Sequence, residues 1–309
     1  MDNSAIDWLL QGDPAVRWQV ERDLAGAPRS TYETTRQRIA ADGWGERFLA
    51  LQDDSGTWGG GLYAPKWTST TYTLLLLTRF GLEQSEPRAV RGSRKLLDDA
   101  FWVDGGVSYW KTHDRAERCV NGIVLAITAW FDVEDDRVDD LAELLIRVPL
   151  ADGGWNCQDY LGDTHSSMHT TISVLEGLEI WRRRRRSLAA DDVIAAGQEF
   201  LLEHRLFRSH TNGEVISDRW TRFSFPPRWH YDVLRGLDYL RDSGAHRDQR
   251  AKEAIELVGR QETNGKWAVG PRHPNKEFFK LEKGGQPGRW NTLRAQRVLN
   301  WWDGGSMTS

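Results

Sequence analysis

The chain has 309 residues, of which 39% are hydrophobic and 28% are charged, and its formal net charge is -4. This balance is typical of a globular protein, and the lack of a broad basic field argues against nucleic acid as a partner. Aliphatic runs such as residues 74–77 are far shorter than the roughly 20 residues of a transmembrane helix, so we expect no transmembrane segment. The N-terminus is acidic where a signal peptide is basic, which predicts a cytoplasmic protein.

Apolar helices are predicted at six places along the chain. The first begins at Asp13 and Pro14, which suit the N-cap and the first helical position. The other five are predicted at residues 70–80, 121–131, 170–181, 231–240 and 291–302. Charge-rich amphipathic segments lie between them near residues 31–52, 86–100, 136–147, 190–204 and 245–262. Because one face of each such segment is polar, we expect these segments to form an outer layer around the apolar helices.

Glycine turns recur along the chain at a regular spacing. Their glycines are 49, 48, 60 and 52 residues apart, at Gly56, Gly105, Gly153, Gly213 and Gly265. A period of this length indicates an array of helix pairs, each opening with a tight turn. The last apolar helix would expose its apolar face unless it packed against the first copy. We therefore predict an all-α fold, an α/α toroid of about six inner helices wrapped by outer helices, as a single domain over residues 1–309.

Two of these turns carry a motif. Residues 52–58 read Gln-Asp-Asp-Ser-Gly-Thr-Trp and residues 261–267 read Gln-Glu-Thr-Asn-Gly-Lys-Trp. Both segments resemble the Gln-x-x-x-Gly-x-Trp repeat of the squalene-hopene cyclase and protein prenyltransferase superfamily. The resemblance implies an α/α barrel whose mouth or centre holds an isoprenoid substrate.

The chain departs from that superfamily in two respects. Triterpene cyclases of the protonating type carry an Asp-x-Asp-Asp acid at the start of an inner helix, and this sequence has none. The nearest string, residues 132–136, falls between a predicted inner helix and a predicted outer helix, where acids favour a helix N-terminus. We interpret it as a solvated turn. Squalene-type cyclases also have a second toroidal domain, for which this chain is too short.

One mouth of the predicted ring is rich in polar side chains. Aligning the apolar helices on their leucines places four residues at one equivalent position: Ser69, Cys119, His169 and Arg228. Beside them in sequence lie Lys66, Trp67, Asn121, His165, Trp229, His230, Asp232, Arg289, Trp290 and Asn291. Apolar residues are the ordinary choice at the start of a buried helix, so this density of ionisable groups indicates a functional site.

A metal is one explanation of this site. Two cysteines in a reducing compartment are free thiols or ligands rather than a disulfide framework. Zinc prefers thiolate and imidazole ligands, which Cys119, Cys157, His165 and His169 offer, with His230 as another partner. His165 and His169 would share one helical face if their helix began early enough. The alternative is that Cys119 packs as a small hydrophobe and the histidines bond to loop backbone. Nothing in the sequence requires a cofactor.

An anionic or polar substrate is the other explanation. Lys66, Arg228 and Arg289, with Arg222, could converge on a carboxylate or diphosphate. His169 and His230 would then supply acid/base catalysis, with Asp232 orienting a ring. In the alternative interpretation, these arginines pair with acids of the long loops, such as Asp159, Asp163 and Asp218.

Sixteen tryptophans are many for a chain of this length. Trp67, Trp229 and Trp290 stand directly before apolar helices, so we expect them to line a ligand cavity. Trp58, Trp155 and Trp267 belong to the repeat and are predicted to pack over neighbouring turns. The arginine run 182–186 is interpreted as the solvated C-terminal end of a helix, where cations suit the helix dipole.

These patterns support three functional hypotheses. The first is a terpene cyclase or prenyltransferase-like enzyme, with its reaction open, that binds a small, isoprenoid-type molecule in an aromatic central cavity. Lys66, Trp67, Asn121, Arg228, Trp229, Arg289 and Trp290 would bind this substrate. The second is a carbohydrate-active toroid of the uronate lyase or glycosidase type, and the third is a binding protein without catalysis.

Overall fold

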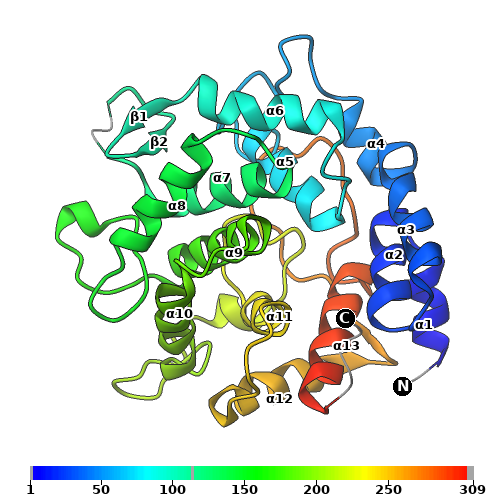
Figure 1. The fold of residues 1–309 in the computed structure, drawn as a ribbon. Coiled ribbons are helices and arrows are strands. Elements are labelled where there is room, and N and C mark those ends of the chain that lie inside the picture. The colour runs from blue at the N-terminus through cyan, green and yellow to red at the C-terminus, as the bar shows by residue number, and fades with distance from the viewer. Residues whose placement is uncertain (1–2, 113–114, 305–309) are drawn as a thin grey trace.

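A computed structural model describes residues 3–112 and 115–304 of the chain. Within these residues, six helices follow one another around a common centre: α2 (Pro14–Asp23), α5 (Thr70–Phe80), α7 (Arg118–Trp130), α9 (Met168–Arg185), α11 (Val233–Asp242) and α13 (Arg289–Trp302) (Figure 1). Leucine, isoleucine and valine side chains of these helices are almost entirely buried. The predicted all-α toroid is confirmed.

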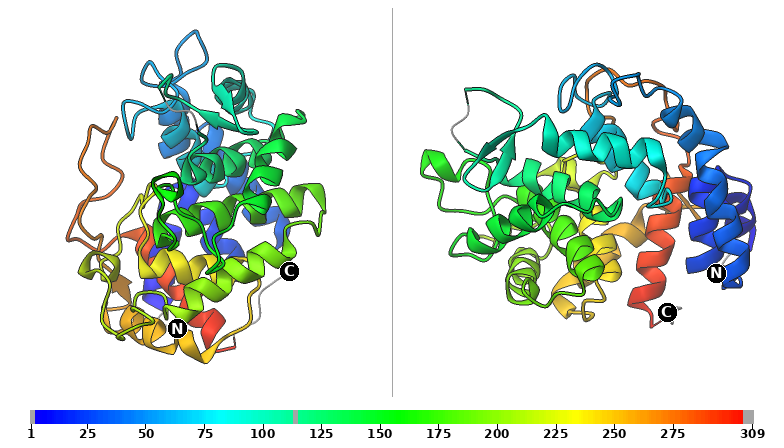
Figure 2. Two further views of the ribbon diagram at one scale, coloured as in Figure 1. Left: turned by 90° about the vertical axis from the view of Figure 1, so that its left-hand side faces the viewer. Right: turned by 45° about the horizontal axis from the view of Figure 1, so that its top comes forward.

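The remaining helices cover the outside of this inner ring. They are α1 (Asn3–Leu10), α3 (Arg29–Gln37), α4 (Gly43–Leu49), α6 (Pro87–Asp98), α8 (Arg137–Arg147), α10 (Asp191–Glu203) and α12 (Lys252–Arg260) (Figure 2). Two antiparallel hairpins add β1 (Phe101–Val103) with β2 (Gly106–Ser108), and β3 (Glu262–Thr263) with β4 (Lys266–Trp267). Short 3-10 turns occupy Arg38–Ala40, Asp159–Leu161, Asp218–Thr221 and Gln249–Ala251.

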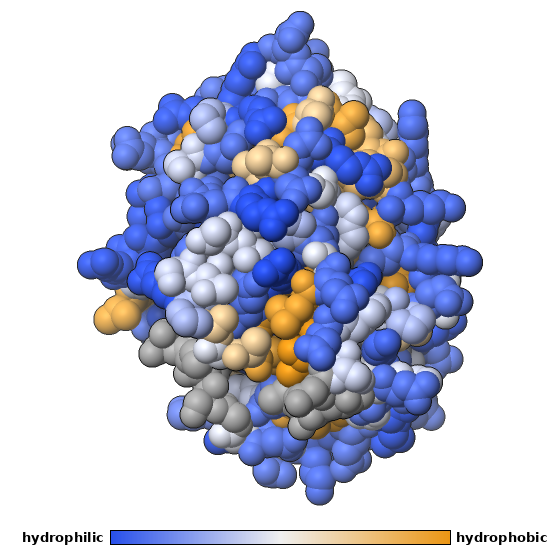
Figure 3. Space-filling model, turned by 90° about the vertical axis from the view of Figure 1, so that its right-hand side faces the viewer, coloured by the Kyte–Doolittle hydropathy of each residue, from blue (hydrophilic) through white to orange (hydrophobic). Residues whose placement is uncertain are grey.

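One face of the ring is mainly hydrophilic. On the face in Figure 3, polar residues dominate and apolar residues form small separate patches. None of the described helices is long and apolar enough to cross a bilayer.

The ring closes where its last inner helix meets its first. Helix α13 packs against both α11 and α2. Arg297 of α13 donates to the side-chain oxygen of Gln19 on α2 at 2.9 Å. On the other side of α2, the indole N–H of Trp18 donates to the carbonyl oxygen of Phe80 at 2.7 Å. Helix α2 is therefore held between α13 and α5.

The repeat turns have a common structure. Gly56, Gly105, Gly153, Gly213 and Gly265 all have positive φ, which glycine adopts at little cost. In three copies the backbone N–H of the repeat tryptophan donates to a threonine hydroxyl in the next inner helix. The indole N–H of the same tryptophan donates to a carbonyl at the end of the preceding outer helix. Trp58, Trp155 and Trp267 are at most 2% exposed, which confirms their packing role.

Three other local predictions are confirmed. Asp13 caps α2, because its carboxylate accepts the N–H of Ala15 at 2.9 Å. The acidic string 132–136 is a turn between α7 and α8, where Asp135 accepts the N–H of Arg137. The arginine run 182–186 forms the last turn of α9 and its C-cap.

Candidate functional site

Several predicted site residues meet at the end of the ring where the inner helices begin. The rings of His169 and His230 lie 5.7 Å apart, and Trp229 stacks on His230 at 3.8 Å. Trp67 lies 6.2 Å from His230, and the Lys66 ammonium lies 5.6 Å above the Trp229 ring. We call this group, together with Arg228 and His273, the imidazole cluster. Helix α9 and the loops before α5 and α11 position it.

A long loop closes this end of the ring. Residues 268–288, which we call the mouth loop, connect β4 to α13 and pass behind the ring in Figure 1. The loop brings His273 onto His230 in a parallel stack at 3.7 Å and pairs Glu277 with Arg228 at 2.9 Å. Its Pro274 carbonyl accepts the indole N–H of Trp67 at 2.8 Å. The mouth is consequently covered, and Trp67 and Arg228 are buried.

The three imidazoles of the cluster are neutral at neutral pH. Burial lowers the pKa of His169 to about 4, and the positive charge of Arg235 adds to this effect. Burial and the neighbouring histidines lower the pKa of His230 to about 3, and burial with Arg228 lowers the pKa of His273 to about 4. The Nδ1 atom of His169 accepts the backbone N–H of Tyr231 at 2.7 Å. As neutral, weakly basic rings, they can accept hydrogen bonds but hold no charge for an anion.

The two cysteines are bonded to each other, contrary to expectation. Cys119 and Cys157 are joined in a disulfide with a Cα–Cα distance of 6.1 Å, which corrects the prediction of free thiols. Of the four predicted zinc ligands, His165 is exposed in the loop before α9, which begins at Met168, so the shared helical face with His169 does not form. Within the described ranges, the single group of three candidate ligands contains Glu117 beside the bonded cysteines and no histidine. The predicted zinc ligands therefore do not converge.

Other predicted residues lie apart from the imidazole cluster. Asn121 is fully buried and bonds the backbone of Val107, so its side chain supports the β1–β2 hairpin. Asp232 caps α11 by accepting the N–H of Arg235 at 2.8 Å, rather than orienting an imidazole. The Arg289 guanidinium lies 4.5 Å from the Trp8 ring centre, on the outer side of α13. Burial raises the pKa of Glu282 to about 7, and its carboxylate accepts the Arg289 N–H.

The remaining mouth residues also have local structural contacts. Ser69 is fully buried as the N-cap of α5, and Asn291 donates to the carbonyl oxygen of Phe223 at 2.7 Å. Arg222 is exposed and donates to the Asp218 carbonyl, and Arg118 pairs with Asp159 at 3.0 Å. The cationic mouth predicted from Lys66, Arg228 and Arg289 therefore does not assemble as one group.

A cavity of about 370 Å³ lies at the centre of the ring, toward the C-terminal ends of the inner helices. Leu75, Ala126, Trp130, Ile180 and Phe225 contribute apolar surface, and Trp290 is the predicted site residue that lines it. Trp290 stacks between Phe225 at 4.5 Å and Phe80 at 5.6 Å. Trp290 therefore lines this cavity, which is a different site from the imidazole cluster.

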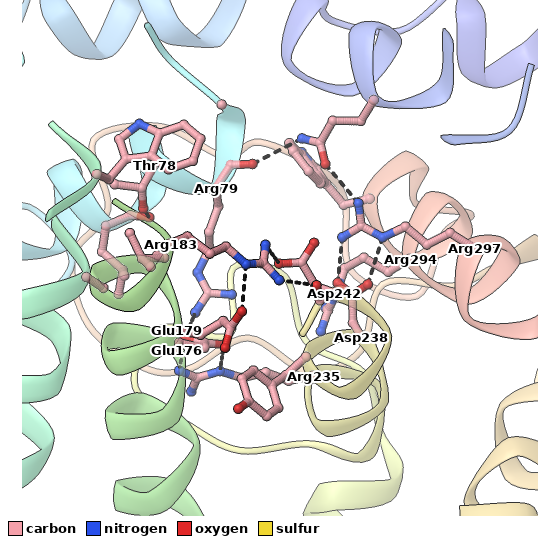
Figure 4. A pocket seen from close by; sticks show the side chains of 18 of the residues that line it. Thr78, Arg79, Glu176, Glu179, Arg183, Arg235, Asp238, Asp242, Arg294 and Arg297 are labelled. Atoms are coloured by element: carbon pink, nitrogen blue, oxygen red, sulfur yellow. Dashed lines mark hydrogen bonds and ion pairs between the residues drawn. The ribbon is translucent and has the colours of Figure 1, made fainter. Parts of the chain in front are cut away.

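Charged residues line the same cavity (Figure 4). Arg235 of α11 forms a bidentate pair with Glu176 of α9 at 2.7 and 2.8 Å, and Arg79 of α5 donates to the same carboxylate at 3.0 Å. Arg297 forms a second bidentate pair with Asp238, at 2.6 and 2.7 Å. These pairs cross between helices, and they connect α5, α9, α11 and α13 around the cavity.

The acids of these pairs are ionised at neutral pH. Burial alone would raise the pKa of Glu176, but Arg235 and Arg79 outweigh it and hold that pKa below its usual range. The same balance, with Arg297 and Arg241 as the cations, lowers the pKa of Asp238. A carboxylate with a depressed pKa is a poor proton donor. The cavity lining therefore carries charged side chains at neutral pH, and Glu176 and Asp238 are poor candidates for protonating a substrate.

Sequence reasoning missed this charged lining. The predicted site residues lie toward the start of each inner helix, whereas these lining residues lie after the aligned leucines. Arg79, Glu179 and Asp238 each stand four residues after Leu75, Leu175 and Leu234. A charge repeated at one register of otherwise apolar helices was the available signal.

No family model matches the chain, and no curated protein matches its sequence. Among solved structures, the fold is similar to that of a protein from Actinoplanes, with a TM-score of 0.52 and 16% identity over 98% of this chain and 100% of the other. It is also similar to the type II terpene cyclase MstE from Scytonema, with a TM-score of 0.45 and 17% identity over 96% and 94% of the two chains. At these identities the likeness concerns the fold alone.

Proposed function

We propose that this chain is a terpene cyclase or prenyltransferase-like toroid protein that binds a small molecule with an isoprenoid-type apolar part in its central cavity. The observation that carries the proposal is the cavity itself, about 370 Å³ with aromatic walls at the centre of the ring. Small-molecule sites are concave, largely apolar and roughly 300–1,000 Å³ in volume. The Gln-x-x-x-Gly-x-Trp resemblance agrees with this ligand class.

The apolar surface is unevenly distributed around the cavity. Helix α7 contributes Ala126 and Trp130 to the described lining, and α9 adds Ile180. An isoprenoid chain placed on this side would bury apolar surface at about 25 cal/mol per Å². The imidazole cluster supplies no lining residue here, so we assign it no step in a reaction on this ligand.

Titration calorimetry with geraniol, geranyl phosphate and geranic acid tests the proposal. Because Ile180 lines the cavity, Ile180→Trp should fill part of it and weaken binding of every ligand that the wild-type protein takes up. Leu188→Trp is the matched control, because Leu188 is 75% exposed and outside the cavity lining. Absence of binding by all three compounds to the folded wild-type protein would refute the isoprenoid proposal.

An acidic sugar is the second candidate ligand. The arginines of the cavity favour it, since a guanidinium matches a carboxylate bidentately. The function would then be that of the carbohydrate-active toroid, and glucuronate in the same titration would bind where the isoprenoids fail.

A further inference from the structure

Arginines outnumber acids in the lining of the central cavity. Seven arginines line the cavity: Arg22, Arg79, Arg183, Arg184, Arg235, Arg294 and Arg297. Four carboxylates line it as well: Glu176, Glu179, Asp238 and Asp242. Positive charge away from bulk water is costly unless a nearby anion compensates it. Arg22 and Arg184 pair with acids outside the lining, Asp23 and Asp132, and the partly exposed Arg183 pairs with Glu179. The buried arginines therefore decide whether an anion is missing from the cavity.

The cavity arginines are unequally partnered. Arg235 directs its three nitrogens to Glu176, the His230 carbonyl and Ser173, and Arg297 is fixed by Asp238 and Gln19. The carboxylates of Glu176 and Asp238 are thus each bound by one guanidinium group through two hydrogen bonds. Arg235 and Arg297 hold the ring together and leave little hydrogen-bonding capacity for a ligand.

Arg294 and Arg79 retain donors without acceptors. The side chain of Arg294 is 4% exposed, and its Nη1 and Nη2 atoms make no hydrogen bond within the described residues. Its nearest carboxylate oxygens belong to Asp232 at 3.8 Å and Asp238 at 3.5 Å, which is ion-pair distance but too long for a hydrogen bond. The Nε atom of Arg79 is likewise buried without a hydrogen-bond partner. Buried unsatisfied donors call for a partner.

The electrostatics of Arg79 agree with this geometry. Burial, with smaller contributions from Arg235 and Arg294, lowers the pKa of Arg79 to about 10, although Glu176 opposes the shift. An additional anion beside these groups would favour the charged form of Arg79.

We propose that the central cavity selects a ligand whose polar end is an oxyanion, a carboxylate or a phosphate, held by Arg294 of α13 and Arg79 of α5. The inference rests on the proposed function and deepens it, because it gives the ligand a charge and an orientation. The anion lies on the side of α5 and α13, and the apolar part of the ligand extends toward Ala126 and Trp130 on α7. A neutral isoprenoid alcohol leaves the arginine donors unsatisfied and binds more weakly.

The test compares geraniol, geranic acid and geranyl phosphate by calorimetry on the wild-type protein and on Arg294→Gln. Geranic acid or geranyl phosphate should bind the wild-type protein about tenfold more tightly than geraniol, or better, since hydrogen bonds to charged groups are stronger than neutral ones. Arg294→Gln should abolish that preference, so that neither anion binds the variant more tightly than geraniol does. The anion that binds more tightly identifies the headgroup.

Control variants keep the result interpretable. Arg260→Gln alters an arginine that is 62% exposed on α12, and it should retain the full preference for the anion. Arg79→Gln tests the second donor separately and replaces Arg294→Gln if that variant does not fold. Equal affinity for geraniol and for both anions in the wild-type protein overturns the oxyanion inference but leaves the isoprenoid proposal intact.

The two proposals also fail differently. If no isoprenoid binds, glucuronate and inorganic phosphate are tested for protection against thermal unfolding. Protection of the wild-type protein but not of Arg294→Gln supports the anion site and removes the isoprenoid. Absence of protection by either anion, together with absence of isoprenoid binding, overturns both.

Discussion

At the scale of single residues, the imidazole cluster links folding to pH. The pKa values of His169, His230 and His273 in the folded chain are about 4, 3 and 4, against 6.5 for an unperturbed imidazole. Because these pKa values are lowered on folding, the unfolded chain binds protons more readily below pH 6.5. The neutral rings therefore contribute stability above pH 6.5, and this contribution is lost as the pH falls toward 4 and 3.

We predict that His273→Phe reduces this loss. Phenylalanine can keep the stack on His230 while removing one titrating ring. Between pH 6.5 and 4.5 the variant should lose about 1–2 kcal/mol less unfolding free energy than the wild-type protein, after allowance for the partial exposure of the ring. Urea denaturation at a series of pH values measures the difference. His246→Phe, at an exposed position, is the control, and an equal pH dependence of the His273 and His246 variants would contradict the prediction.

The imidazole cluster also shows how far the site could be predicted from sequence. His169, Trp229 and His230 were found because they stand directly before inner helices, where a repeat fixes the register. His273 could not be predicted as a member of the cluster, because its position depends on the path of the mouth loop and no periodicity governs that path. Arg294 could not be predicted as a cavity residue, because an arginine in a helix is usually exposed. Its burial follows only from the closure of the ring around it.

At the scale of elements, the bond from each repeat tryptophan to a threonine fixes the turn to the next inner helix. Thr292 accepts the Trp267 N–H at 3.0 Å, and Thr171 accepts the Trp155 N–H at the same distance. The threonine sits at 0% exposure in both copies, so water cannot replace it as an acceptor. An unsatisfied buried N–H costs about 1–3 kcal/mol.

We predict that Thr292→Val lowers the unfolding free energy by about 1–3 kcal/mol. Valine keeps the shape of the side chain but removes the hydroxyl acceptor. Thr34→Val on α3 is the matched control, since Thr34 is exposed, and it should change stability by less than about 0.5 kcal/mol. Chemical denaturation of the three proteins gives the comparison, and equal stability of both variants would show that the bond contributes little.

The elements themselves were predictable to different degrees. The inner helix at Thr70–Phe80 was predicted residue for residue, because a polar start and Gly81 with positive φ mark both ends. The outer segment 31–52 was expected as one element but divides into α3 and α4, because Gly43 has positive φ and Asp13 accepts the Trp44 N–H. The second of these causes is a contact across 31 residues, which local pattern does not reveal.

At the scale of the whole molecule, one arginine connects both sides of the closure. Arg297 lies on α13, pairs with Asp238 on α11 at 2.6 Å, and reaches Asp23 on α2 at 3.4 Å. Burial would raise the pKa of Asp238, yet Arg297 and Arg241 hold it below its usual range, so the acid stays charged. Removal of Arg297 leaves a buried carboxylate with weaker partners, which is more costly than loss of a surface pair.

We predict that Arg297→Met destabilises the chain by about 3–5 kcal/mol, the cost of breaking a buried pair on one side. Arg260→Met, which removes an exposed pair with a 3.9 Å separation, should cost less than about 1 kcal/mol. Adding Asp238→Leu to Arg297→Met should restore part of the loss, because the uncompensated charge is then gone. Hydrogen exchange locates the effect: amides of α2 and α13 should exchange faster in Arg297→Met, while those of α7 and α9 change less. Uniform acceleration around the ring would mean that Arg297 supports the core in general rather than its closure.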